Sequence, residues 1–444
     1  MTYETQKRLL WDLINEALKA ADPYEAVRKV LLVDDGAVRV DGVEVSGYSN
    51  SYLLAIGKAA CKMSRAVMEV LDVKEGLIVT KRGYAGDCPR RKNLTVVEAG
   101  HPIPDSNSIK AGKLGLELAR KVKKGDLLIV LISGGGSAVF ELPDDGISLE
   151  DIVRTNDLLL RSGAKIHEVN TVRKHLSRVK GGKLAMEVKG TIISLIVSDV
   201  VGDNVEAIAS GITAKDPTTF RDAYEVLMKY GVWEELPESV RAHIVKGLEG
   251  KVHETLKEEL PNVHNVVIAG IGKACEAVAR RGEGLGFNTA ILTTEMEGEA
   301  KDVGLSLGSI AREVALRNRP FNEPALLIAG GETTVTVGKA SGKGGPNQEL
   351  ALSATRKIAG LPVILAAFDT DGTDGPTDAA GAIVDGATMK KLGEAGIDVD
   401  RALRDHDSYN ALDRVGALLK TGPTGTNVNS MVIMMVGSPK VITR

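Results

Sequence analysis

The sequence predicts an α/β fold in which two α/β domains, each with a mainly parallel and Rossmann-like sheet, face each other across a cleft. Two observations lead to this prediction. Short apolar runs alternate with helical patterns along the whole chain, which is the order of elements in an α/β protein. The chain also has 444 residues, a length that suits two or three domains of ordinary size.

Nine apolar runs are predicted to be strands. Most are continuously apolar instead of alternating, as is typical of strands buried on both faces of a parallel sheet. They cover residues 51–57, 76–80, 94–99, 126–132, 191–197, 265–270, 289–294, 325–330 and 362–368. Helical patterns lie between them, and right-handed crossovers would place these helices on both faces of each sheet.

A weak internal repeat suggests two related halves. The segment LLAIGKAACKMSRAV, which begins at Leu53, resembles VIAGIGKACEAVARR, which begins at Val267. Strand–glycine–helix turns recur in any α/β protein, so a chance likeness stays open as the alternative. The polar stretch 220–262 is the expected connection between an N-terminal domain (1–240) and a C-terminal domain (241–444), with a margin of tens of residues.

The composition excludes several classes of protein. The 56 Lys and Arg residues against 59 Asp and Glu give a net charge of -3, whereas a dedicated nucleic-acid-binding protein normally carries a basic excess. Glycine is abundant, at 49 residues, and aromatic residues make up only 3%. Many glycines with few rings favour backbone-lined anion loops over base-stacking or carbohydrate platforms.

The cysteines and the apolar runs bear on location. Cys61, Cys88 and Cys275 are odd in number and match no zinc spacing, which predicts free thiols in a reducing compartment. The N-terminal amphipathic pattern is not that of a signal peptide. The apolar runs are far shorter than the ~20 residues that a membrane span needs. We therefore expect a cytoplasmic protein without a membrane partner.

A glycine-rich loop follows the most apolar of the predicted strands. Its residues are Ser133, Gly134, Gly135, Gly136 and Ser137. Ligands of open α/β sheets bind outside the carboxyl ends of strands, and glycines leave backbone N–H groups free to surround phosphate oxygens. The loop is predicted to bind an anion, and a tight turn without a ligand is the alternative.

The segment 170–185 concentrates positive charge without any acid between its first and last cation. Its charged residues are Arg173, Lys174, His175, Arg178, Lys180 and Lys183. If the segment is one helix, Arg173 and Lys180 share a face because they are seven residues apart. We predict that Arg173 and Lys180 contact a phosphate or carboxylate, although a solvated helix face would also explain the charges.

Acidic residues follow another buried strand. Ser198 and then Asp199 follow the run 191–197, and a carboxylate at the end of a buried strand could bind Mg²⁺ or abstract a proton. Asp203 is predicted to cap the next helix instead.

The second half contains a further group of candidate residues. A predicted strand ends in Gly330, Gly331 and Glu332, and a loop rich in glycine and lysine follows, with Lys343 and Asn347 near its end. Such a flexible, electropositive loop suits a polyphosphate, so these five residues are predicted to bind the nucleotide.

Four aspartates lie just beyond the strand at 362–368. They are Asp369, Asp371, Asp374 and Asp378. Their spacing does not complete a calcium loop, which leaves a magnesium–nucleotide site, with Asp369 and Asp371 as candidate ligands, or a cluster of Asx turns.

Several common catalytic motifs are missing. The sequence has no Walker loop, and the pattern that begins at Gly270 has Cys275 where a dinucleotide fingerprint needs its third glycine. There is no metal spacing among the seven histidines and no GxSxG elbow. The motifs therefore do not support a hydrolase, a zinc enzyme or an NAD enzyme.

Taken together, these segments resemble the MOFRL family of glycerate kinases, the class II or glycerate 2-kinases. The stretches that carry the resemblance run through nearly the whole chain in the family's order. They are AIGKAA with Lys58, GHPIPDSNS, ISGGGSA, NTVRKHLSRVKGGKLA, SDVVGDN, ASGITAKDPTT, GGETTVTV, GKGGPNQE, DTDGTDGPTDAAGA and TGPTGTNVN.

The resemblance implies two α/β domains and a reaction in which ATP and D-glycerate give ADP and 2-phospho-D-glycerate with Mg²⁺ or a similar ion. It implies Lys58 as a catalytic or substrate-binding lysine and Asp199 as a candidate base. Many relatives have arginine where this chain has Pro346, so Lys343 or Arg173 would have to supply that charge. Phosphoryl transfer needs positioning, positive charge, a metal and a group that orients the attacking hydroxyl, and these residues provide them.

Two alternative functions stay open. Relatives of the family have been named hydroxypyruvate reductases, but an NAD(P)H enzyme would lack its usual fingerprint here. A non-catalytic protein that binds a nucleotide or anion would keep the glycine loops without needing Lys58 or Asp199. Small molecules are the expected partners, and a homo-oligomer is left open.

Overall fold

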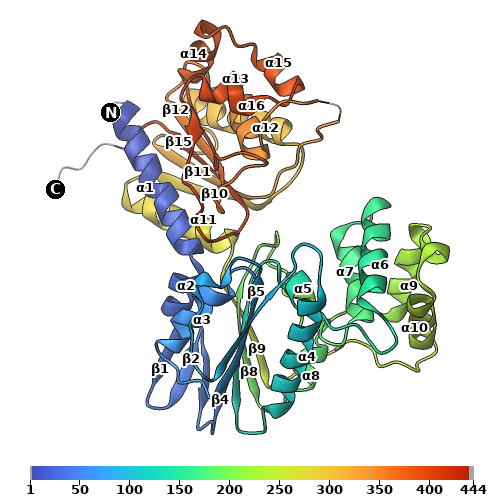
Figure 1. The fold of residues 1–444 in the computed structure, drawn as a ribbon. Helices are drawn as coiled ribbons and strands as arrows, with labels where there is room; N and C mark the ends of the chain where they lie inside the picture. Colours follow the sequence, from blue (N-terminus) through green and yellow to red (C-terminus); the bar gives the residue numbers. More distant parts are fainter. Residues whose placement is uncertain (1–2, 339, 440–444) are drawn as a thin grey trace. The chain divides into compact units, whose positions relative to one another are not determined.

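The computed structural model describes residues 3–338 and 340–439, which form two compact units (Figure 1). The N-terminal unit contains residues 23–198 and 203–268. The C-terminal unit contains residues 3–22, 199–202 and 269–439. The main change of unit falls between Ile268 and Ala269, and the first helix of the chain belongs to the C-terminal unit.

The N-terminal unit is built on a six-stranded sheet with the order β6-β5-β4-β7-β8-β9. The pairs β6–β5, β5–β4, β4–β7 and β7–β8 are all parallel. The strands are β4 (Ser51–Ile56), β5 (Glu75–Lys81), β6 (Leu94–Ala99), β7 (Leu127–Ile132), β8 (Thr191–Val197) and β9 (Val263–Ala269). Their carboxyl ends meet at one edge of the sheet, which is where ligands bind in such folds.

Helices cover both faces of this sheet, as the apolar strands predict. Figure 1 shows α2 (Pro23–Val30) and α3 (Ala60–Met68) on one face, and α4 (Ser106–Lys121), α5 (Gly136–Val139) and α8 (Lys183–Met186) on the other. A small antiparallel sheet, β1 (Leu31–Asp34), β2 (Ala37–Val40) and β3 (Val43–Ser46), adjoins α2 in the chain. The sequence prediction did not include these three short strands.

A separate helical cluster with its own apolar core completes this unit. Its helices are α6 (Leu149–Arg161), α7 (Ile166–Leu176), α9 (Phe220–Lys229) and α10 (Glu238–Leu248). The core of the cluster contains Leu159, Val172, Phe220, Leu227 and Ile244, all nearly inaccessible to solvent. Ser148 and Thr219 cap α6 and α9 with side-chain oxygens that accept backbone N–H bonds.

The sheet of the C-terminal unit is mixed, so the prediction of a mainly parallel sheet is wrong for this half. Its order is β10-β11-β15-β12-β13-β14, and only β10–β11 is parallel. The strands are β10 (Asn288–Met296), β11 (Ala325–Gly331), β12 (Val363–Asp369), β13 (Gly381–Asp385), β14 (Leu418–Leu419) and β15 (Ser430–Val436). The last strand inserts antiparallel between β11 and β12.

Helices on both faces explain why these antiparallel strands are continuously apolar. On one face, Leu327 packs in the core formed with α12 (Ala300–Arg317) and α13 (Pro346–Ile358). On the other, a Cβ at Gly282 of α11 (Ile271–Gly284) would stand 2.2 Å from Leu326 Cδ2, and α1 (Tyr3–Ala21) packs against α11. Burial on two faces therefore does not require parallel pairing. The remaining helices are α14 (Thr388–Glu394), α15 (Val399–Arg404) and α16 (Ser408–Asp413).

The two six-stranded sheets have different strand orders, so the internal repeat does not extend to whole domains. The first copy of the repeated segment forms β4, its turn and α3 within one unit, whereas the second forms β9 in the N-terminal unit and α11 in the C-terminal unit. The likeness is therefore that of two local strand–turn–helix segments and not of two repeated domains.

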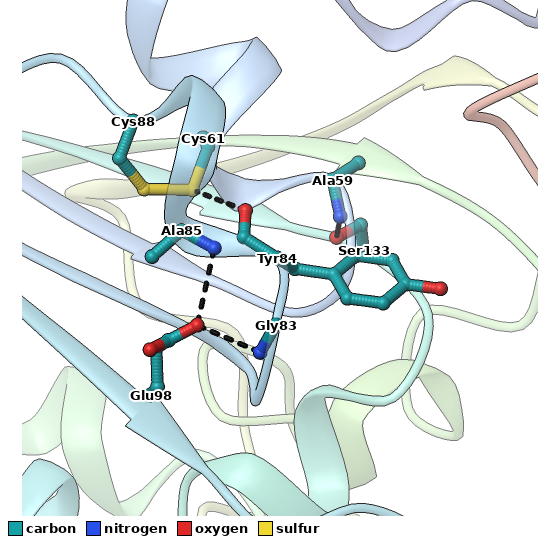
Figure 2. The surroundings of a disulfide bond; sticks show 8 residues. All are labelled: Ala59, Cys61, Gly83, Tyr84, Ala85, Cys88, Glu98 and Ser133. Atoms are coloured by element: carbon teal, nitrogen blue, oxygen red, sulfur yellow. Dashed lines mark hydrogen bonds between the residues drawn. A yellow bond between two sulfur atoms is a disulfide. The ribbon is translucent and has the colours of Figure 1, made fainter.

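The cysteines differ from the prediction of three free thiols. Cys61 and Cys88 form a disulfide that joins α3 to the short turn η1 (Ala85–Asp87), while Cys275 is free and buried (Figure 2). The odd number of cysteines gave no sign of this pairing, because the two partners meet only through the packing of α3 beside the loop after β5. Across the described ranges, no helix combines the length and the apolar character that a membrane span requires.

Candidate functional site

Lys58 lies between β4 and α3, at the carboxyl end of a central strand of the parallel sheet. Gly57 precedes it with φ +109°, and a Cβ there would stand 2.3 Å from the carbonyl oxygen of Ser133. The N–H of Lys58 donates to the carbonyl of Gly134 at 2.9 Å, and the N–H of Ala59 donates to Ser133 Oγ at 3.1 Å (Figure 2). The Lys58 ammonium makes no hydrogen bond or ion pair with a described residue, so it is available to a ligand.

The glycine-rich loop follows β7, the strand next to β4. Gly135 has φ +81°, a conformation that favours glycine. Within residues 3–338 and 340–439, the N–H groups of Gly134, Gly135 and Ser137 donate no hydrogen bond, and all three residues are partly exposed. Successive free N–H groups in a tight turn make a concavity suited to an anion. The loop and Lys58 thus bring positive charge and N–H donors to one place.

His101 lies against the same loop, from the segment after β6. A Cβ added to Gly135 would stand 2.9 Å from His101 Cδ2, 3.1 Å from its Nε2 and 3.4 Å from Lys58 Cγ. The imidazole is half-buried and has no hydrogen-bond partner among the described residues. Burial, followed by the charges of Lys58 and Lys81, lowers the pKa of His101, so the ring is neutral at pH 7.

A chain of polar side chains connects the glycine loop with Arg173. Ser137 Oγ lies 2.8 Å from Ser210 Oγ, and Ser210 donates to Asn170 Oδ1 at 3.4 Å. Arg173 reaches that oxygen at 3.5 Å and donates to Asn156 at 2.8 Å. Burial lowers the pKa of Arg173, and the guanidinium forms no ion pair with a described residue. A half-buried cation without a paired carboxylate suits an anionic ligand.

Ser210 is held in place by a strained turn. Ala209 and Ser210 have φ of 49° and 57°, a left-handed conformation that costs roughly 1–3 kcal/mol for residues other than glycine. The carbonyl of Ser210 accepts the N–H of Gly181 at 3.0 Å. A Cβ at Gly136 would stand 2.7 Å from Ala209 Cβ, so the strained turn packs directly on the glycine loop.

The basic segment 170–185 is not one helix. The helix α7 ends at Leu176, and Gly181 and Gly182 have positive φ before α8 begins. Arg173 and Lys180 therefore do not share a helical face, and that prediction is wrong. Most of the cations also have partners within the protein, in the pairs Lys174–Asp216, His175–Glu254, Arg178–Asp145, Lys180–Glu141 and Lys183–Asp144.

Lys180 is predicted above to contact a phosphate or carboxylate, but in the structure it pairs with a carboxylate of the protein itself. It is completely buried, and its ammonium donates to Glu141 Oε2 at 2.7 Å and to the carbonyl of Phe140 at 3.0 Å. Ser177 donates to the other oxygen of Glu141 at 2.6 Å. Removing one member of such a buried pair would leave an uncompensated charge, so we assign Lys180 a structural role and omit it from the binding residues proposed below.

Asp199 and Asp203 lie in different units. Asp199 is partly buried. The pKa of Glu332 is raised, first because neighbouring atoms partly desolvate its carboxylate even though the residue as a whole is exposed, and then by the charges of Asp199 and Glu297. The capping role predicted for Asp203 is wrong: no helix starts at that point, Asp203 has φ 51°, and its buried Oδ1 has no partner in the described part of the chain.

Two of the predicted nucleotide-binding glycines are explained by packing at the end of β11. A Cβ at Gly330 would stand 2.3 Å from Ile271 Cγ1, and one at Gly331 would stand 2.3 Å from the backbone N of Met296. Glu332, the next residue, is exposed, and its N–H donates to the carbonyl of Met296 at 2.8 Å. Both glycines are therefore needed whether or not a nucleotide binds there.

Lys343 and Asn347 differ in accessibility. Lys343 is exposed, and its ammonium lies 3.7 Å from the centroid of the Tyr409 ring. Asn347 is only 1% exposed, and its amide donates to Asp374 at 3.1 Å and to Ser430 at 2.9 Å. Asp374 also accepts the backbone N–H groups of Asn347 and Gln348. The N-terminus of α13 is thus occupied by a carboxylate of the protein itself.

Asp369 is the last residue of β12, and Asp371 lies beside it in the turn that follows. The N–H of Asp371 donates to Asp369 Oδ1 at 2.9 Å, and Asp371 accepts two bonds from Thr373, as in an Asx turn. Burial, with the charges of Asp371 and Asp374, raises the pKa of Asp369 to about 7. The described residues contain no cluster of three or more carboxylate, histidine or cysteine ligands. Two adjacent carboxylates nonetheless fit Mg²⁺, which commonly keeps several waters and takes its other ligands from phosphates.

Sequence reasoning assigned no role to His101, Asn170 or Ser210. His101 and Asn170 stand in the segments GHPIPDSNS and NTVRKHLSRVKGGKLA, and Ser210 in ASGITAKDPTT. All three segments carried the family resemblance, which was the available signal. Only the fold shows that His101 and Ser210 meet the glycine loop and that Asn170 joins Ser210 to Arg173.

Family models match both halves of the chain. The model of a domain of unknown function, DUF4147, matches residues 9–245, and the model of the MOFRL family matches residues 325–430.

Similar full-length proteins and structures are also known. The chain is 60% identical to a glycerate 2-kinase of Pyrococcus horikoshii, over 96% of this chain and 97% of that one, and 44% identical to a D-glycerate 2-kinase of Thermotoga maritima, over 98% and 99%. A crystal structure of a Pyrococcus horikoshii protein matches with a TM-score of 0.91 and 59% identity over 97% of this chain and 98% of the other. The crystal structure of Thermotoga maritima glycerate kinase matches with a TM-score of 0.88 and 43% identity over 98% and 100%.

Proposed function

The chain belongs to the MOFRL and DUF4147 family of glycerate 2-kinases, and on this basis we propose that it transfers the γ-phosphoryl group of ATP to D-glycerate. The products are 2-phospho-D-glycerate and ADP. The single structural observation that supports this function most is the meeting of Lys58 with the free N–H groups of Gly134 and Gly135 at the carboxyl ends of two parallel strands.

The proposed division of roles follows from charge and accessibility. Lys58 and the glycine loop stabilise the negative charge of the transferring phosphoryl group, because preorganised donors stabilise developing charge strongly. Ser137 and Arg173 bind anionic oxygens beside the loop. Asp199 accepts the proton of the attacking hydroxyl as that oxygen bonds to phosphorus and the bond to the ADP oxygen breaks.

The nucleotide is proposed to bind to the C-terminal unit. Lys343 and Glu332 are the exposed candidates there, while Gly330, Gly331 and Asn347 shape the backbone around them. Asp369 and Asp371 would hold Mg²⁺, which when bound neutralises charge on the phosphates. Binding of the cation would also relieve the repulsion between these adjacent carboxylates.

A reductase activity is the second candidate, because a 38% identical protein of Agrobacterium vitis, aligned over 97% of this chain and 94% of its own length, is provisionally named a hydroxypyruvate reductase. The turn after β9 argues against it in this chain. Cys275 is fully buried in α11 and a Cβ at Gly330 would stand 2.9 Å from its sulfur, so this position is filled by packing and the dinucleotide fingerprint is incomplete.

One pair of assays tests the proposed function. The protein is given ATP, Mg²⁺ and D-glycerate, ADP release is followed, and phosphorus NMR identifies the product. In parallel, NADH oxidation is measured with hydroxypyruvate. ADP formation that depends on glycerate, with phosphate on the 2-hydroxyl and no NADH oxidation, is the expected result. NADH oxidation without phosphorylation would overturn the kinase, and binding without either reaction would favour a non-catalytic protein.

A further inference from the structure

His101 is a polar side chain at the candidate site that the proposed function does not use. Its ring lies beside Gly135 and Lys58. A Cβ added to Gly135 would stand 3.1 Å from His101 Nε2 and 3.4 Å from Lys58 Cγ. Neither ring nitrogen has a partner among the described residues. A half-buried imidazole usually has a hydrogen-bond partner, so this one requires an explanation.

We propose that His101 is a substrate-binding residue that, together with Lys58 and the N–H groups of Gly134 and Gly135, holds an anionic oxygen of the acceptor substrate or of the transferring phosphate. The inference deepens the proposed kinase function and rests on it. The four donors follow the carboxyl ends of three strands of one sheet, β4, β6 and β7, of which β4 and β7 are neighbours and β6 is separated from β4 by β5.

The surroundings of His101 favour an anion over a cation or an apolar group. Lys58 faces the ring from the turn after β4, and Lys81 from the end of β5; the glycine loop after β7 has no charged side chain. Of the acids nearby in sequence, Asp105 is paired with Arg82 and Glu98 accepts the N–H groups of Gly83 and Ala85 (Figure 2). No carboxylate of the glycine loop therefore neutralises Lys58 and Lys81, the two cations that face the His101 ring.

Binding of an anion should change the protonation of His101. In the free protein, burial and the two lysines lower its pKa. An anion placed between the ring and Lys58 favours the charged imidazolium, which raises that pKa again. Binding should therefore be accompanied by proton uptake, and affinity should weaken as pH rises above the pKa of the free protein.

Calorimetry of the whole protein without ATP tests this directly. D-glycerate and, separately, inorganic phosphate are titrated at pH 6.5 in two buffers that differ in ionisation enthalpy, which gives the number of protons taken up. The same titrations are made with His101→Gln and with His167→Gln, a matched control in which an exposed histidine of α7 is changed. Circular dichroism checks that each variant is folded.

The wild type and His167→Gln should take up protons on binding, whereas His101→Gln should take up almost none and bind about tenfold or more weakly, as expected for a lost hydrogen bond to a charged group. A loss confined to glycerate identifies the acceptor's carboxylate as the bound group, and a loss confined to phosphate identifies the phosphoryl group. Equal affinity and equal proton uptake in His101→Gln would overturn the proposal. Because no turnover is measured, failure of the kinase assay and failure of this inference are separate results.

Discussion

At the scale of single residues, Lys58 is the clearest case of a side chain that the fold does not need. Its ammonium has no partner among the described residues, so Lys58→Ala should lower turnover by at least two orders of magnitude, a loss of about 3 kcal/mol of transition-state stabilisation. The melting temperature should change little. Steady-state kinetics with glycerate and ATP measure the first effect and calorimetry the second.

The matched control is Lys113→Ala, which removes an exposed lysine from α4 in the same unit. It should leave both turnover and stability unchanged. Wild-type turnover in Lys58→Ala would show that this lysine takes no part in the reaction.

Residue types alone predicted correctly that the glycine loop follows a strand end, because glycines after an apolar run indicate that geometry. Lys58 was named only through the family resemblance. Residue types did not distinguish Arg173 from Lys180. Both stand in the same basic segment, but one has neutral amide partners and the other a buried carboxylate, Glu141. That difference depends on Glu141, which is far away in the chain, and so no local pattern reveals it.

At the scale of elements, Glu254 fastens the loop after α10 to the helical cluster. It accepts bonds from His175 Nε2 at 3.1 Å and from the N–H of Phe220 at 3.0 Å. Burial alone would raise the pKa of Glu254, but these bonds and one from Lys257 outweigh it and lower the pKa to about 2. Because the folded pKa lies below that of the unfolded chain, the stabilisation is present above about pH 4.5 and is lost as pH falls toward 2.

Glu254→Gln should therefore lower the free energy of unfolding by roughly 1 kcal/mol at pH 7, after allowance for the partial exposure of the carboxylate. The difference from wild type should shrink as the pH is lowered toward 3. Urea unfolding in a Trp11→Phe background measures both values, because the fluorescence then comes from Trp233, which packs on the helical cluster. Glu249→Gln, at an exposed pair with Lys251, is the control, and a difference that grows on acidification would contradict the assigned role.

The disulfide ties α3 to the loop after β5, across 27 residues. Closing a loop of that length restricts the unfolded chain and stabilises the fold by roughly 3.5 kcal/mol in the chain-entropy model. Cys88→Ser should lower the urea midpoint of the N-terminal unit accordingly. A thiol assay on the denatured, unreduced protein should find one free thiol, that of Cys275, and three after reduction; three before reduction would mean that the bond does not form.

The sequence predicted the positions of strands better than the direction in which they pair. All nine apolar runs form strands, and the run at 191–197 matches β8 residue for residue. The direction of pairing was missed in the C-terminal unit because a buried antiparallel strand such as β12 has the same apolar pattern as a parallel one. The strands β13, β14 and β15 were not among the predicted runs. The short strands β1–β3 were also missed, since four-residue strands with half-exposed residues carry little periodic signal.

At the scale of the whole molecule, the path of the chain is not a simple succession of two domains. The helix α1 begins the sequence but packs against α11 of the C-terminal unit, with an ion pair of 2.6 Å between Asp12 and Arg281. Composition and periodicity identified α1 as an amphipathic helix. They could not assign it to a unit, because its buried face meets residues more than 250 positions later, a separation that no local pattern records.

This topology predicts that a change near the N-terminus destabilises the C-terminal unit. Leu13 is fully buried in α1, so Leu13→Ala should lower the stability of that unit by about 2–5 kcal/mol through lost burial and the cavity left behind. The chain has two tryptophans, Trp11 in α1 and Trp233 in the N-terminal unit. Each therefore reports on one unit.

Two single-tryptophan variants separate the fluorescence of the two units. Trp233→Phe leaves only the signal of Trp11 in α1, and Trp11→Phe leaves only that of Trp233 in the helical cluster. In urea, Leu13→Ala should shift the Trp11 transition to lower concentration while the Trp233 transition stays in place, because Trp233 packs on the core of the helical cluster, which is separate from the core of the C-terminal sheet. The conservative change Leu13→Met, which keeps the volume, should move neither by much. Equal shifts of both transitions would mean that the units unfold as one cooperative body, and a shift of the Trp233 transition alone would contradict the placement of α1.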